Sequence, residues 1–157
     1  MDEPFTPPPP QIVAVWTALM RASRQVREAV ERALKAAGLP PLDWYDALWE
    51  IEQAPEGIRP NALETRLLLP QYGLSRLIAR LVEAGYVARG PSPGDGRGQL
   101  LHLTDAGRAV RRAMWPVYGA ALTRTFAGTR AESEAARLAA LLKGLTGEGR
   151  PPQPPIA

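Results

Sequence analysis

Two arginines, Arg76 and Arg80, lie one helical turn apart in a segment whose apolar residues recur at helical spacing. The polar side of this predicted helix also carries Tyr72 and Ser75, and its first acid, Glu83, comes only at the far end. A solvated helix face usually mixes acids and bases as i,i+4 pairs, whereas two stacked arginines repel each other. Such a pair is favourable when a polyanion neutralises it, because a guanidinium binds phosphates and guanine edges bidentately. We therefore expect a polyanion-binding face, with an ordinary solvated face as the alternative.

The charge along the chain is uneven, although the net charge is only +3. Residues 59–112 carry nine Lys/Arg against four Asp/Glu, whereas residues 1–58 carry five against nine and residues 113–157 five against three. Seventeen of the nineteen cations are arginine. A GC-rich genome would explain the number of arginines but not their clustering, so the middle third is the expected partner surface.

The composition argues against catalysis and metal binding. The 157-residue chain has no cysteine, which excludes disulfides, thiolate metal sites and cysteine nucleophiles. Its single histidine, His102, offers one candidate base for a Ser-His-Asp triad and too few ligands for a histidine-rich metal site. We expect no enzyme, no metal and no cofactor. Apolar runs of at most five residues and a start without a signal-peptide pattern predict a cytoplasmic protein without membrane contact.

Helices are predicted on the N-terminal side of the two arginines. Residues 11–36 carry one long apolar stripe made of Ile12, Trp16, Leu19, Val26, Val30 and Ala33. A stripe of about seven turns exceeds what a small core can cover, so we expect it to pack against a partner chain. Further helices are predicted from an Asp43 N-cap to about residue 53, from Pro60 through Leu67, and over residues 71–84.

A hairpin and two more helices are predicted on the C-terminal side. Residues 86–89 and 99–103 resemble strands, and a Gly/Pro-rich turn with Arg97 at its tip joins them. Such a tip suits the DNA backbone or a minor groove, and a floppy turn is the alternative. Thr104 is the predicted cap of a helix to about Phe126, kinked or broken near Pro116. A capping box at residues 129–132 opens the last helix.

Three motifs in this order resemble the MarR family of bacterial transcription regulators. They are LSRLIARLVEAGYVAR at residues 74–89, DGRG at 95–98 and LTDAG at 103–107. The resemblance implies a mainly α fold with a small β-hairpin wing, a winged helix-turn-helix flanked by dimerisation helices. The implied divisions are a Pro-rich disordered tail, an N-terminal dimerisation helix, a DNA-binding lobe, C-terminal dimerisation helices and a second disordered tail, over residues 1–10, 11–38, 39–104, 105–146 and 147–157.

The resemblance implies a homodimer on double-stranded DNA, acting as a sequence-specific regulator, and we expect a repressor. Two recognition helices would enter successive major grooves of a pseudo-palindromic operator. The implied DNA contacts are Gln71, Tyr72, Ser75, Arg76, Arg80 and, in the wing, Arg97. For Tyr72, packing against the hairpin is the alternative to a phosphate contact.

Aromatic residues indicate a small aromatic effector as a further ligand. In proteins like MarR the first, second and fifth helices flank a ligand cavity, and here they carry Trp16, Trp44, Tyr45, Trp115 and Tyr118. Plain core packing explains the same residues. A different function, a winged-helix module that binds a protein and not DNA, would expose an apolar or acidic helix face, and Arg76 and Arg80 argue against it.

Overall fold

The computed structural model describes residues 6–68, 72–91 and 98–146 and is mostly helical with one antiparallel hairpin, as the sequence predicted. The elements in chain order are α1 (Pro10–Ala36), α2 (Leu42–Glu52), α3 (Pro60–Glu64), α4 (Leu74–Glu83), β1 (Val87–Pro91), β2 (Gln99–Leu103), α5 (Asp105–Phe126), α6 (Arg130–Ser133) and α7 (Ala135–Thr146). No described helix is long and apolar enough to cross a membrane.

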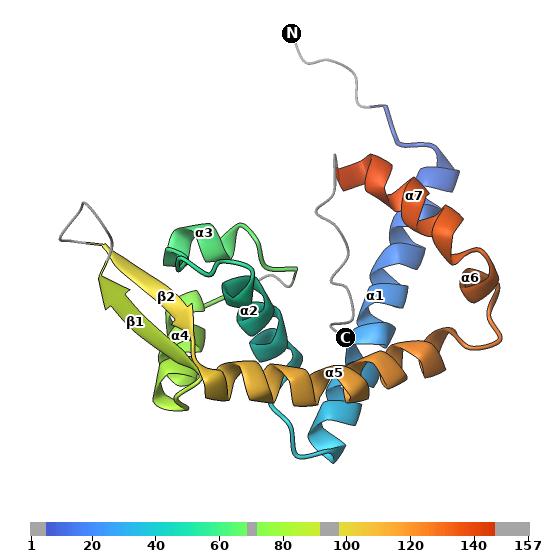
Figure 1. Cartoon of the computed structure of the whole chain (residues 1–157). Coiled ribbons are helices and arrows are strands. Elements are labelled where there is room, and N and C mark those ends of the chain that lie inside the picture. The colour runs from blue at the N-terminus through green and yellow to red at the C-terminus, as the bar shows by residue number, and fades with distance from the viewer. Residues whose placement is uncertain (1–5, 69–71, 92–97, 147–157) are drawn as a thin grey trace, which may run out of the picture.

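Helix α5 connects two parts of the molecule (Figure 1). Around its beginning lie α2, α3, α4 and the hairpin, and we call this part, residues 39–104, the lobe. Around its end lie α1, α6 and α7, which together with α5 form the stem. Helix α4, which carries the two arginines, therefore lies in the lobe, and the long helix α1 lies in the stem.

Two apolar cores correspond to these parts, and α2 contributes to both. The lobe core combines Leu48 and Ile51 of α2 with buried residues of α3, α4 and the hairpin, namely Leu63, Leu77, Ile78, Leu81, Val87 and Leu101. The stem core combines Tyr45 and Trp49 of α2 with buried residues of α1 and α5, namely Val30, Leu34, Met114 and Ala121. Helix α2 therefore joins the lobe to the stem through its two faces.

The hairpin pairs Val87 with Leu103 and Pro91 with Gln99. A short third segment adds to it, because Ile58 and Leu101 exchange two backbone hydrogen bonds, of 3.1 and 2.9 Å. The preceding Gly57 has φ +92, and a Cβ there would lie 2.6 Å from the His102 ring. A glycine is thus required where the chain turns onto the hairpin. No strand was predicted from the sequence at Ile58, because a single bridging residue leaves no alternating pattern.

Both predicted threonine caps are confirmed. The Thr104 hydroxyl accepts a hydrogen bond from the Gly107 amide at 3.0 Å and donates one to the Gly85 carbonyl at 2.7 Å, which joins the start of α5 to the end of α4. Thr129 accepts from the amide of Glu132 at 3.2 Å, and the Glu132 carboxylate accepts from Gly128.

Several predicted boundaries are wrong. Asp43 is not the N-cap of α2; the helix begins directly after the extended Pro41, and Glu31 of α1 accepts the hydrogen bond of the Leu42 amide at 3.3 Å. The cap therefore comes from another helix. Helix α3 ends at Glu64, one turn before Leu67, whose partly buried side chain packs on the lobe core after the helix has ended.

The C-terminal helices also differ from the prediction. Pro116 removes one amide donor from α5, yet the helix continues without a break, because Met114 and Ala121 on either side of the proline are buried in the stem core. The last predicted helix is two helices, because Glu134, with φ −111 and ψ 19, leaves helical geometry between α6 and α7.

Candidate nucleic-acid interface

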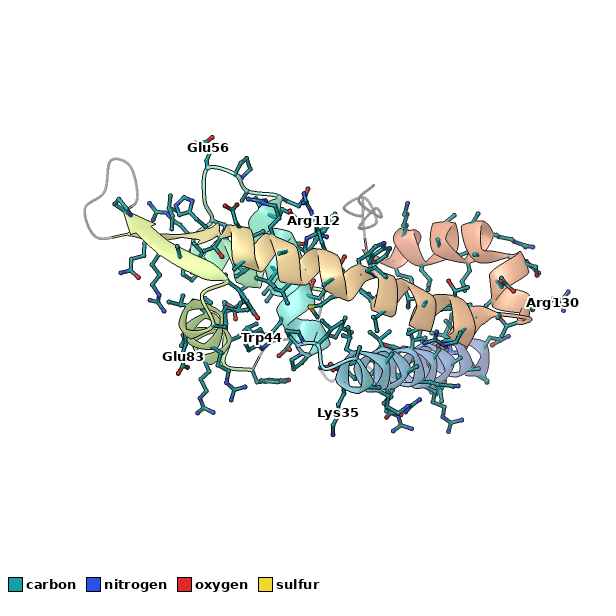
Figure 2. The ribbon with its side chains drawn as sticks, turned by 60° about the horizontal axis from the view of Figure 1, so that its bottom comes forward. Lys35, Trp44, Glu56, Glu83, Arg112 and Arg130 are labelled. Carbon is teal, nitrogen blue, oxygen red and sulfur yellow. The ribbon has the colours of Figure 1, made fainter. Side chains whose placement is uncertain are left out.

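Helix α4 presents the two arginines on a free face. Ser75, Arg76 and Arg80 are exposed, whereas Leu77 and Leu81 on the opposite side are buried in the lobe core. This division follows from the helical period, which places the apolar and polar residues on opposite sides. Figure 2 shows α4, marked by Glu83, on the far side of the lobe from Arg112 of α5.

The ends of α4 are set by two glycines. Gly73 precedes the helix with φ +95 and Gly85 follows it with φ +76, a conformation that other residues rarely adopt. The helix therefore begins at Leu74, three residues later than predicted. Tyr72 lies before the helix and is fully exposed, with a relative accessibility of 101%, so the alternative that it packs against the hairpin is wrong. Gln71 and Arg97 lie outside the described residues.

Neither arginine of α4 has an ion-pair partner within residues 6–68, 72–91 and 98–146. The exposed Arg89 of β1 adds a cation on the hairpin, and it donates to the neutral Gln99 side chain at 3.0 Å. Arg89 was not among the predicted site residues, although a cation at an exposed position of the first hairpin strand was a usable signal. On α4 and the hairpin, three described arginines thus carry a charge that no acid offsets by direct contact.

A buried carboxylate of α2 anchors the chain after α3. Asp46 of α2 is 2% exposed, and its Oδ2 accepts a hydrogen bond from the Leu68 amide at 2.8 Å. The Leu68 side chain is 67% exposed, so the contact is made by the backbone and not by apolar burial of the side chain. Asp46 was not predicted as a site residue, because no local motif links positions 22 residues apart.

Three of the five predicted aromatic residues come together in the stem. Tyr45, Trp115 and Tyr118 form a cluster with ring centroids 5.1–6.1 Å apart. Burial raises the pKa of the Tyr45 hydroxyl, and burial also raises the pKa of Tyr118, with smaller contributions from Tyr45 and from the charge of Asp46. Both phenols are therefore neutral at physiological pH.

The other two aromatic residues lie elsewhere. Trp44 packs edge-on against Tyr86 of the lobe, with centroids 5.9 Å apart, and Trp16 of α1 is 63% exposed. An open hollow of about 370 Å³ lies between α1 and α5, lined by Ala29, Arg32, Ala33, Ala121, Arg124 and Thr125. None of the aromatic residues predicted for a pocket lines it. The described residues contain no group of three or more acidic or histidine side chains able to hold a metal.

A protein-family model described as the MarR family matches residues 37–98, which include α2, α3 and α4. The multiple antibiotic resistance protein MarR of Escherichia coli is 35% identical over 86 residues, which cover 55% of this chain and 60% of that protein. The chain is thus similar to the MarR family over its lobe. The predicted fold class, mainly α with a small β-hairpin as in MarR-family regulators, is confirmed.

Two solved MarR-family structures extend the likeness over most of the chain. A mutant of E. coli MarR complexed with operator DNA is 25% identical, with a TM-score of 0.75 over 87% of this chain and 96% of that one. CouR of Rhodococcus jostii bound to p-coumaroyl-CoA is 25% identical, with a TM-score of 0.70 over 87% of this chain and 94% of that one.

Proposed function

We propose that this protein is a sequence-specific double-stranded DNA-binding transcriptional regulator that acts as a homodimer in the cytoplasm, most simply as a repressor. The observation that carries the proposal is the free face of α4, where Arg76 and Arg80 are exposed beside Ser75 while the opposite face is buried. A rigid cationic helix face matches the width and the guanine acceptors of a DNA major groove. The complex of the similar E. coli MarR mutant with operator DNA supports DNA binding by this chain.

The stem supports the dimer. Its α1 exposes apolar side chains, with Ile12 59%, Trp16 63% and Met20 52% exposed, and α7 exposes Leu141 and Leu145. Apolar surface of this extent on two helices of one end indicates association, and a two-fold axis is the commonest solution for identical chains. A two-fold dimer presents two α4 helices, which requires a pseudo-palindromic operator with half-sites about 10 base pairs apart.

The contacts would divide between bases and phosphates. Arg76 and Arg80 suit guanine edges or phosphates, while Tyr72, fully exposed just before α4, suits a phosphate. Gln71 and Arg97, predicted from the sequence, complete the set as a major-groove and a wing contact. The lobe, residues 39–104, would thus bind DNA, and residues 11–38 and 105–146 would dimerise.

An aromatic effector is the second part of the proposal. The cluster of Tyr45, Trp115 and Tyr118 lies where the lobe meets the stem, so a ligand inserted there would change the relative position of the two parts. The CouR structure holds p-coumaroyl-CoA, an aromatic acyl ligand. Release of DNA by small aromatic acids is the expected effect. If such acids do not change the affinity for DNA, the aromatic cluster is core packing and not a ligand site.

Selection of bound DNA from a random pool tests the proposal. The purified protein should enrich one inverted-repeat sequence with a fixed separation between half-sites. Enrichment without any shared sequence, or no retention of DNA at about 0.1 M salt, would contradict it, and a winged helix that binds protein would then be the better account.

A further inference from the structure

Glu52 at the end of α2 holds two arginines of α5. Its Oε1 lies 3.1 Å from Arg108 Nη1, and its Oε2 lies 2.5 Å from Arg111 Nε. The side chains of Glu52 and Arg111 are 11% and 1% exposed, whereas Arg108 is 37% exposed. Arg111 also lies over the Trp49 ring, 5.5 Å from its centroid. We call these three residues, Glu52, Arg108 and Arg111, the clamp.

The clamp lies at the border between the two apolar cores. On α2, Ile51 belongs to the lobe core and Trp49 to the stem core. On α5, Val110 packs on the lobe core and Met114 lies in the stem core. Charged side chains are rarely buried this deeply, because removing them from water costs free energy that an ion pair often does not recover. A pair retained between two cores therefore calls for a role other than stability.

The clamp fixes the orientation of α2 relative to α5 at this border. Apolar packing is non-directional, so two apolar surfaces tolerate small rotations against each other. One carboxylate makes a charge-assisted hydrogen bond to Arg108 and an ion pair with Arg111, so it holds the end of α2 at two successive turns of α5. The clamp thus sets the angle at which the lobe, with its α4, leaves α5.

We infer that the clamp determines which half-site spacing the dimer accepts. The inference rests on the proposed function, since it requires two lobes on one operator. Inserting one base pair between half-sites moves one of them by about 3.4 Å and turns it by about 35° around the DNA axis. A lobe held by the clamp cannot follow this shift without breaking the contacts of Glu52. A lobe that is held by apolar packing alone can follow it.

The test replaces the buried pair by apolar side chains of similar size, Glu52→Leu with Arg111→Met. Such replacements of buried ion pairs are often neutral or stabilising, and a Met sulfur packs well on the Trp49 ring. Dissociation constants are measured on the selected operator and on versions with one base pair inserted or deleted between half-sites. Arg112→Met, which removes an exposed charge next to the clamp, is the matched control.

The wild-type protein and the control should bind the altered spacings at least about tenfold more weakly than the selected one, which corresponds to the cost of one mismatched base pair. The double variant should discriminate by less than about threefold, with unchanged dimer mass and unchanged affinity for the selected spacing. A broadened spacing profile at constant affinity is not expected from a residue that only stabilises the fold.

Arg108→Met covers the case in which the double variant does not fold. Arg108 is more than a third exposed, so its loss is tolerable, and it removes one of the two contacts of Glu52. We expect its spacing discrimination to fall between wild type and double variant. A spacing profile identical to wild type in the folded variants overturns the inference while leaving the proposed function intact. Absence of operator binding by the wild-type protein overturns the proposed function and the inference with it.

Discussion

The lobe and the stem both contain amphipathic helices, but they differ in which helix face is exposed. In the lobe, α4 buries its leucines within its own chain and exposes its arginines. In the stem, α1 and α7 leave Ile12, Trp16 and Leu141 exposed. The lobe surface is complete within one chain and suits a charged ligand, whereas the stem surface is incomplete without a second copy. Exposed polar faces and exposed apolar faces of amphipathic helices therefore indicate two different kinds of partner, DNA and a second copy of the chain.

The largest expected effect comes from charging the stem. Trp16→Glu with Leu141→Glu should split the dimer, because two carboxylates per chain would enter the apolar interface without partners. Light scattering should return about 17.0 kDa in place of twice that mass. Operator affinity should fall about 100-fold or more, because two linked contacts become one.

The control for the stem variant is a charge on the lobe side. Glu56→Lys, at an exposed loop position of the lobe, should leave the mass at the dimer value. A charged-stem variant that keeps the dimer mass would show that the exposed apolar faces are not the interface.

A middle-sized effect is expected where α2 anchors the chain after α3. Asp46→Ala removes the carboxylate that accepts the Leu68 amide and should lower the free energy of unfolding by about 1–3 kcal/mol. Operator affinity should fall by about tenfold because Leu68 loses its attachment to α2 within the lobe. Urea unfolding and DNA titration measure the two quantities separately.

Asp43→Ala is the matched control on the same helix, since Asp43 lies in the first turn of α2 and is not its cap. Equal losses of DNA affinity in both variants would mean that the effect comes from α2 as a whole and not from the contact to Leu68.

The smallest effect concerns alkaline pH. Burial raises the pKa of Tyr45 and Tyr118 above 10.0, so the folded chain holds these protons more tightly than the unfolded chain. The stability is complete below about pH 10 and is lost as the pH rises through the folded-state pKa values. Tyr118→Phe should therefore flatten the decline of the melting temperature above about pH 10. Tyr72→Phe, at an exposed position, should not change it.

The parts of the fold that were predicted correctly depend on local sequence patterns. The helical spacing of Leu74, Leu77 and Leu81 and the threonine caps at 104 and 129 are written in neighbouring residues, and the structure confirms them. The free face with Arg76 and Arg80 follows from the same period. The prediction failed where distant residues decide, as in the capping of α2 by Glu31 in place of Asp43.

The polar contacts that position the site were not predictable for the same reason. Asp46 meets Leu68, and Glu52 meets Arg111, only because the fold packs α2 against α5 and against the chain after α3. From sequence, each of these acids resembles a surface residue of a helix. The aromatic residues were wrongly grouped because residue type alone does not give location. Trp16 and Trp44 are aromatic like the residues of the stem cluster, but they lie elsewhere.

DNA binding by the free face of α4 is tested by the double substitution Arg76→Ala with Arg80→Ala. Arg112→Ala with Arg124→Ala, two exposed arginines of α5, removes the same charge elsewhere and serves as the control. We expect a loss of about 1–3 kcal/mol per base contact, hence operator affinity at least about 100-fold lower in the dimer. The melting temperature should change by less than about 2 °C, because both side chains point away from the core. An α4 variant that melts like wild type and binds the operator as tightly as the control would contradict the account.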